Sequence, residues 1–124
     1  MGVRHFGGSA VQIRNFYLFF FCGELYSMTD ENKYKTGLKK RILERFPGSI
    51  VLHLDPNECQ GIPDLLVLWR NHWAALEGKK HAKAGKRPNQ DYYVSQCDSM
   101  SFARVIFPEN EKEVLDEMEQ SFQA

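Results

Sequence analysis

The chain lacks the cysteine pattern of two common protein classes. Its three cysteines, Cys22, Cys59 and Cys97, are far apart in the sequence and form no CxxC pair. Such spacing indicates neither a disulfide framework nor a zinc site, and it favours an intracellular, cytoplasmic location. An excess of one charge is also missing, because 16 lysines and arginines balance 16 aspartates and glutamates. The overall charge therefore names no partner.

A long apolar run is missing as well. The most membrane-like stretch, residues 16–22, has about a third of the length that a helix needs to cross a bilayer. Residues 25–27, Leu-Tyr-Ser, are a poor match to the small-residue cleavage site of a signal peptide. We therefore expect no membrane partner.

The N-terminal part of the chain differs from the rest. Residues 1–27 have no helical or strand period, little charge and a cluster of aromatic residues. From Met28 onward the sequence is typical of the start of a helix. We interpret residues 1–27 as a poorly specified extension and residues 28–124 as one domain, because no repeat or linker-like tract divides them. Whether Met1 or Met28 is the natural start stays open at this point.

Hydrophobic periodicity and turn residues predict the elements of this domain. They are a helix (30–46), three strands (49–55, 64–70 and 73–79), a helix opened by Pro88, a strand (102–107) and a helix opened by Asn110 and Glu113. The turn Asn71-His72 joins the second and third strands into a hairpin. The expected fold is therefore α/β, a mixed sheet flanked by helices, with an amphipathic helix at the C-terminus.

Charged residues stand at one end of the predicted hairpin. Asp64 begins its first strand, and Glu77 and Lys79 end its second. Side chains alternate between the faces of a strand, so Glu77 and Lys79 point the same way. In an antiparallel pair the start of one strand lies beside the end of the next, so all three side chains can meet.

Two carboxylates that meet in this way repel each other unless a cation lies between them. A hard divalent cation with oxygen ligands, most naturally Mg²⁺, meets that requirement. A lysine beside such a metal can position or deprotonate a water molecule, or neutralise an anionic transition state. The strand ends therefore predict a metal-assisted hydrolytic site.

These residues resemble a known signature. Asp64 followed by Glu77-Gly78-Lys79 resembles the PD-(D/E)XK nuclease motif, and the expected order of elements resembles the αβββαβ core of those restriction-endonuclease-like proteins. The segments GIPDLL, ALEGKK and RPNQ are similar to the small viral and bacterial nucleases of the VRR-NUC type. The resemblance covers roughly residues 30–108.

The resemblance implies a role for each matching residue. Asp64 and Glu77 would bind Mg²⁺, or Mn²⁺ as a substitute, together with the main-chain carbonyl of Gly78. Lys79 would be the catalytic lysine, and Gln90 an accessory residue that faces the site. In this family the middle residue of the E-x-K motif is more usually hydrophobic, so Gly78 is a departure from the pattern.

The family also places a glutamate on its first helix, and two residues here qualify. Glu31 lies three residues before Tyr34, on the apolar face that should look at the sheet. Glu44 lies about 200° around the helix from Ile42, at 100° per residue. Helical geometry favours Glu31 over Glu44.

The resemblance also implies a partner and an activity. The exposed basic run that follows the motif would contact DNA phosphates, with Lys80, Lys83, Lys86 and Arg87 as the contact residues. The short hairpin turn leaves no room for a sequence-reading insertion. We therefore expect a homodimeric endonuclease selective for branched DNA such as a Holliday junction, with a flap or nicking nuclease, or a DNA-binding module without cleavage, as alternatives.

Overall fold

The computed structural model describes residues 9–13, 16–21, 24–25 and 29–124. Met1 and Met28, the two possible natural starts, lie outside these residues. In the described part of the chain, no helix has the length and apolar character needed to cross a membrane.

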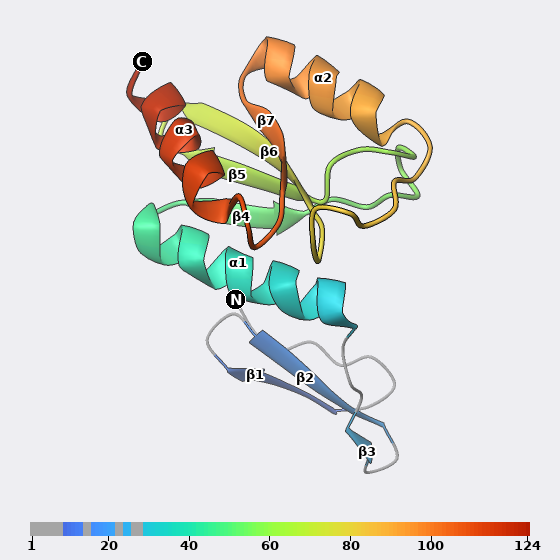
Figure 1. Cartoon of the computed structure of the whole chain (residues 1–124). Coiled ribbons are helices and arrows are strands. Elements are labelled where there is room, and N and C mark those ends of the chain that lie inside the picture. The colour runs from blue at the N-terminus through green and yellow to red at the C-terminus, as the bar shows by residue number, and fades with distance from the viewer. Residues whose placement is uncertain (1–8, 14–15, 22–23, 26–28) are drawn as a thin grey trace.

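A small antiparallel sheet lies in the N-terminal segment (Figure 1). It contains β1 (Ser9–Ile13), β2 (Phe16–Phe21) and β3 (Glu24–Leu25), in that order. Residues 1–27 have no strand period in their sequence, so these strands differ from expectation. The strand β2 reads FYLFFF and is apolar throughout, so alternation cannot reveal it.

The remaining elements follow the order expected from the sequence. They are α1 (Asp30–Arg45), β4 (Ile50–His53), β5 (Leu65–Trp69), β6 (His72–Gly78), α2 (Gln90–Met100), β7 (Ala103–Ile106) and α3 (Glu111–Gln123). The second sheet has the strand order β4-β5-β6-β7. Its first two pairs are antiparallel, whereas β6 and β7 are parallel and are joined through α2. The prediction of an α/β fold with a mixed, helix-flanked sheet is confirmed.

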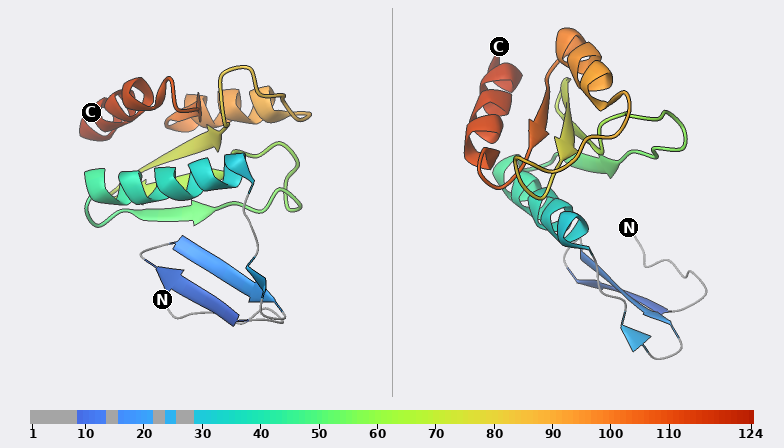
Figure 2. Two further views of the ribbon diagram at one scale, coloured as in Figure 1. Left: turned by 60° about the horizontal axis from the view of Figure 1, so that its bottom comes forward. Right: turned by 45° about the vertical axis from the view of Figure 1, so that its right-hand side comes forward.

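Helices cover both faces of this sheet. The helices α1 and α3 lie on one face and α2 lies on the other (Figure 2). The main core lies on the first face, where apolar side chains of α1 and α3 pack against β4 to β7. Its buried members include Leu38, Ile42, Val67, Leu76 and Met118.

Two details of the turns differ from expectation. The hairpin turn is Arg70-Asn71, one residue earlier than predicted, because Trp69 pairs directly with His72. The helix α2 begins at Gln90, so Pro88 precedes it instead of lying in its first turn.

The start of α3 also differs. Asn110 is the N-cap residue, but its side chain makes no capping hydrogen bond to the helix. Its amide instead accepts from the Phe107 main-chain N–H and donates to the Val105 carbonyl. Asn110 therefore fixes the link between β7 and α3, and the predicted capping pair with Glu113 is not formed.

Candidate metal centre at the open end of the hairpin

The end of the β5–β6 hairpin opposite its turn brings the predicted carboxylates together. Asp64 directly precedes β5, and its Oδ2 accepts a 3.0 Å hydrogen bond from the main-chain N–H of Gly78. The main-chain oxygen of Asp64 accepts from the N–H of Leu54, at 2.8 Å. Asp64 is therefore tied to the strand ends on both sides.

Glu77 is the most deeply buried member of the site. It is 2% exposed, and its Oε1 atom is buried without a hydrogen-bond partner among the described residues. Burial, together with hydrogen bonding and charge repulsion from Asp64, raises the pKa of Glu77 to about 8, against the opposing effect of Lys79 and Lys35. An oxygen in this state is costly unless a proton or a cation reaches it.

Lys79 lies on the same side of β6 as Glu77 and is also buried. Its Nζ lies 3.7 Å from Glu77 Oε2 and donates a 2.9 Å hydrogen bond to Gln90 Oε1. Gln90, the first residue of α2, is 4% exposed, and its Oε1 also accepts from the main-chain N–H of Arg87, at 2.9 Å. The predicted catalytic lysine and accessory glutamine are thus in direct contact.

A second lysine, which the sequence analysis missed, completes the cluster. Lys35 on α1 is 8% exposed, and its Nζ lies 3.1 Å from both Glu31 Oε2 and Asp64 Oδ2. A signal for it exists in the sequence, because Lys35, Leu38 and Ile42 share one helical stripe and all three are buried. Lysine is rarely buried unless it is paired, and here it is paired twice.

Gly78 makes room for this lysine. A Cβ atom added to Gly78 would lie 3.0 Å from Cγ and 3.3 Å from Cε of Lys35. The aliphatic part of Lys35 therefore packs against Gly78, in space that a larger residue at position 78 would occupy. The departure from the usual E-x-K pattern and the buried lysine are two parts of one arrangement.

The glycine of the GIPD segment ties two parts of the site together. Gly61 has a φ of +91°, and a Cβ there would lie 2.7 Å from main-chain and side-chain atoms of Asn89. Asn89 itself has a φ of 67° and directly precedes α2. The loop before Asp64 thus packs against the turn that carries Gln90, and only glycine fits this approach.

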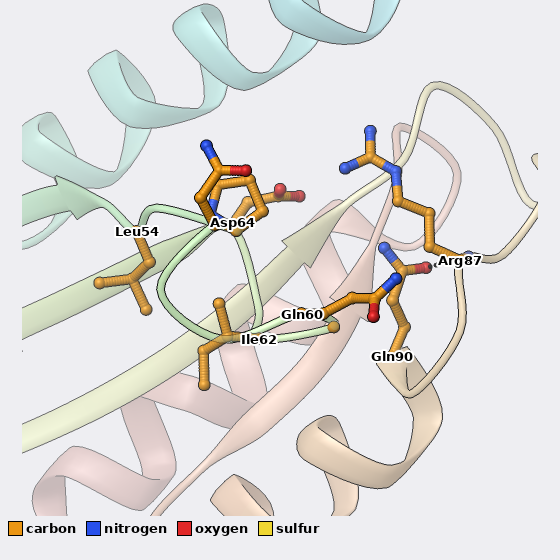
Figure 3. A pocket seen from close by; sticks show the side chains of 9 residues that line it. Leu54, Gln60, Ile62, Asp64, Arg87 and Gln90 are labelled. Atoms are coloured by element: carbon orange, nitrogen blue, oxygen red, sulfur yellow. Dashed lines mark hydrogen bonds between the residues drawn. The ribbon is translucent and has the colours of Figure 1, made fainter.

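Two cavities open beside the cluster. One, of about 420 Å³, is lined by Asp64, Gln90 and Arg87 together with loop residues such as Gln60 and Ile62 (Figure 3). Another, of about 570 Å³, lies between the start of α1 and the basic loop, with linings that include Glu31, Lys80 and Arg87. Arg87 lines both cavities.

The predicted DNA-contact residues divide into two pairs. All four are exposed. Lys80 and Arg87 line the cavities beside the cluster, whereas neither Lys83 nor Lys86 does so in the cavities described above. Lys86 forms a 3.1 Å ion pair with Asp91, at an exposed position.

The two first-helix glutamates are in different surroundings. Glu31 lies at the edge of the cluster and reaches it through Lys35. Glu44 is exposed near the other end of α1. The geometry therefore places Glu31, and not Glu44, next to the other predicted site residues.

The carboxylates of this cluster could hold a hydrated magnesium ion, but they do not form a fully enclosed metal site. Within residues 29–124 and the described N-terminal strands, no group of three or more Asp, Glu, His or Cys side chains is arranged to hold a metal. Mg²⁺ usually keeps several waters and binds through one or two carboxylates plus substrate phosphate. Asp64 and the unpartnered Glu77 oxygen supply such a pair.

Comparisons with protein-family models, with curated proteins and with solved structures find no match to this chain. The geometry of the site is therefore the basis for assigning a function.

Proposed function

We propose that the protein is a Mg²⁺-dependent endonuclease that hydrolyses phosphodiester bonds in DNA, with Mn²⁺ as a substitute metal. The observation that carries this proposal is the buried Glu77 carboxyl group beside Asp64 and Lys79, whose Oε1 has no hydrogen-bond partner among the described residues. These residues stand next to an exposed basic loop that can neutralise phosphates.

Each side chain has a separate task in this mechanism. Asp64 and Glu77 would hold Mg²⁺, with the Gly78 carbonyl as a further proposed ligand, and the ion would supply Lewis-acid stabilisation of the charge that develops on the phosphate. Lys79 orients the attacking water or neutralises the phosphate oxygen. Gln90 fixes the Lys79 ammonium group through its 2.9 Å hydrogen bond.

We propose further that α1 to β7 form a restriction-endonuclease-like core. The support is the element order, one helix, three antiparallel strands, a crossover helix and a parallel strand. Of the site residues, Asp64 directly precedes β5, Glu77 and Lys79 lie at the end of β6 and just after it, and Gln90 begins α2.

We propose further that the substrate is branched DNA and that the protein acts as a homodimer. The turn Arg70-Asn71 is too short to carry a sequence-reading insertion, which favours recognition of DNA shape. A two-fold dimer would present two sites to the two strands of a junction. Exposed apolar side chains on β4, at the edge of the strand order, offer a surface for it: Ile50 is 55% exposed and Leu52 43%.

One assay separates the possible activities. Purified protein is incubated with a labelled four-way junction, a flap and plain duplex, with Mg²⁺ or with EDTA. We expect Mg²⁺-dependent cutting of the junction. Preferred cutting of the flap would instead identify a flap or nicking nuclease.

The non-cleaving DNA-binding module is the second candidate. The pairing of Lys35 with Asp64 favours it, because a cation of the protein itself already contacts a proposed metal ligand. DNA binding without cleavage under any divalent ion would establish this alternative.

Asp64→Ala tests the site itself. This variant should lose cleavage by about a hundredfold to a thousandfold, the scale seen when a group that stabilises transition-state charge is removed. Its DNA binding, measured by gel shift, should persist. Surviving cleavage would refute the proposed metal site.

A further inference from the structure

The buried ammonium group of Lys35 contacts a carboxylate that the proposed metal would also bind. Its Nζ lies 3.1 Å from Asp64 Oδ2, one of the two proposed carboxylate ligands. The Lys35 side chain is 10% exposed and that of Asp64 is 20% exposed, so solvent screens the contact only in part. Asp64 is therefore neutralised by the protein itself.

The surroundings hold Lys35 in this position. Glu31 Oε2 accepts its second contact at 3.1 Å, one helical turn away on α1. On β6, the absence of a side chain at Gly78 leaves space for the Lys35 stem, since a Cβ there would lie 3.0 Å from its Cγ. The helix α1 and the strand β6 therefore together form a binding site for one ammonium group.

The cluster around this group contains three carboxyl groups and two ammonium groups. Glu31, Asp64 and Glu77 supply carboxyl groups, and Lys35 and Lys79 supply ammonium groups within the same cluster. A divalent cation added to this set would bring two positive charges beside Lys35. Two like charges a few ångströms apart repel strongly where water is partly excluded.

We infer that Lys35 is an internal counter-ion that a divalent metal must displace from Asp64, and that this residue sets the metal affinity of the site. This inference rests on the proposed function and deepens it, because it names the residue that regulates access of the metal. After displacement, the Lys35 ammonium group keeps its contact with Glu31, so that it moves without leaving the cluster.

The test is metal binding, measured without any substrate. Isothermal titration calorimetry with MgCl₂ compares the wild-type chain with Lys35→Met, which keeps the apolar stem and removes the charge. We expect Lys35→Met to bind Mg²⁺ at least about tenfold more tightly, because the repulsion between the Lys35 ammonium group and the metal ion is removed. Lys40→Met, on the exposed side of the same helix, should leave the affinity unchanged.

Thermal unfolding gives a second readout. Without metal, Lys35→Met should unfold at a lower temperature than the wild type, because Asp64 and Glu77 lose a counter-ion. Saturating Mg²⁺ should raise its Tm by more than it raises that of the wild type. If Lys35→Met does not fold, as judged by circular dichroism, Lys35→Gln takes its place in both measurements.

The outcomes separate this inference from the proposed function. Equal or weaker Mg²⁺ binding by the Lys35 variants, with saturable binding by the wild type, would overturn the inference and leave the nuclease proposal standing. Binding by Lys35→Met but not by the wild type would support the counter-ion role and reject Mg²⁺-dependent catalysis by this chain. No binding by either protein would overturn both, and Asp64→Asn should abolish any binding that is seen.

Discussion

The two ends of the β5–β6 hairpin have opposite chemistry. At the turn, the Trp69 ring packs against Phe46 and Phe122, with ring centroids 5.3 Å and 5.8 Å away. His72 stacks on Phe122 at 5.7 Å. At the open end, the same two strands deliver Asp64 and Glu77 to a cluster of buried charges.

The difference separates the end that stabilises the fold from the end that carries the proposed site. Aromatic side chains at the turn bury apolar surface and gain pair energy, so they stabilise the fold. Buried charges at the open end carry a desolvation cost that their mutual attraction only partly repays. A site of this kind persists because the rest of the hairpin is well packed.

The largest effect on stability should come from the turn end. Phe46 is 1% exposed and contacts both Trp69 and Phe122. Phe46→Ala should lower the free energy of unfolding by about 3–5 kcal/mol, since it removes apolar contacts and leaves a cavity. Chemical denaturation measures the loss, and the cleavage rate per folded molecule should be unchanged.

Arg70→Ala is the matched control at this end. Arg70 is exposed in the turn, with its guanidinium 4.2 Å from the centroid of the Trp69 ring. Its replacement should cost less than about 1 kcal/mol, the usual value of an exposed cation–π contact. A loss as large as that of Phe46→Ala would show that the turn itself, and not aromatic packing, stabilises this end.

At the open end we predict an unusual pH dependence. The pKa of Glu77 is about 8 in the folded protein, against an ordinary value of 4.5. Between these two values the folded state binds more protons than the unfolded state, so stability falls as pH rises from about 4.5 to about 8. In EDTA the Tm should drop by several degrees over this range, since 1 kcal/mol corresponds to about 4–8 °C for a domain of up to about 100 residues.

Glu77→Gln should remove this fall in stability, because glutamine does not titrate. The exposed residue Glu58 provides the control, and Glu58→Gln should keep the wild-type pH profile. Saturating Mg²⁺ should also flatten the profile of the wild type, since the metal favours the ionised carboxylate. A wild-type Tm that rises steadily between pH 5 and pH 8 in EDTA would contradict the buried state of Glu77.

Sequence reasoning could predict this contrast in outline. Strand alternation and hairpin geometry are enough to bring Asp64, Glu77 and Lys79 to one end of the sheet. The element order from α1 to α3 followed from periodicity and turn residues in the same way. Local pattern carries this information because the domain alternates short, regular elements with Pro- and Gly-rich turns.

Lys35 shows what local pattern cannot supply. A lysine on a helix is normally assigned to solvent, and only its place on the stripe with Leu38 and Ile42 indicates otherwise. Its partner Asp64 is distant in sequence, and its space depends on the absent side chain of Gly78. In the sequence, Gly78 only suggests a weakened strand. The structure adds that its missing side chain leaves space for Lys35.

A moderate effect on catalysis is expected from Gln90. Its Oε1 accepts from both Lys79 Nζ and the Arg87 N–H, so it fixes the position of the proposed catalytic lysine. Gln90→Ala should lower kcat roughly tenfold to a hundredfold, the scale of losing an outer partner that orients a catalytic group. Single-turnover cleavage measures this, and Mg²⁺ affinity from calorimetry should stay at the wild-type value. A variant that loses metal binding as well would show that Gln90 supports the carboxylates and not only Lys79.

The smallest effect should come from the basic loop, and it extends the comparison of the two hairpin ends to DNA binding. Lys83 is exposed on the loop that follows the open end, whereas Arg70 is exposed at the turn. If phosphates lie along the loop, Lys83→Ala should reduce the slope of log K against log salt by about one, and Arg70→Ala should leave it unchanged. Fluorescence anisotropy with labelled junction DNA over a range of salt concentrations measures both slopes. Because a single phosphate contact changes affinity only a few-fold at fixed salt, the slope is the sharper readout. Equal slopes for the two variants would show that DNA is not confined to the open end of the hairpin.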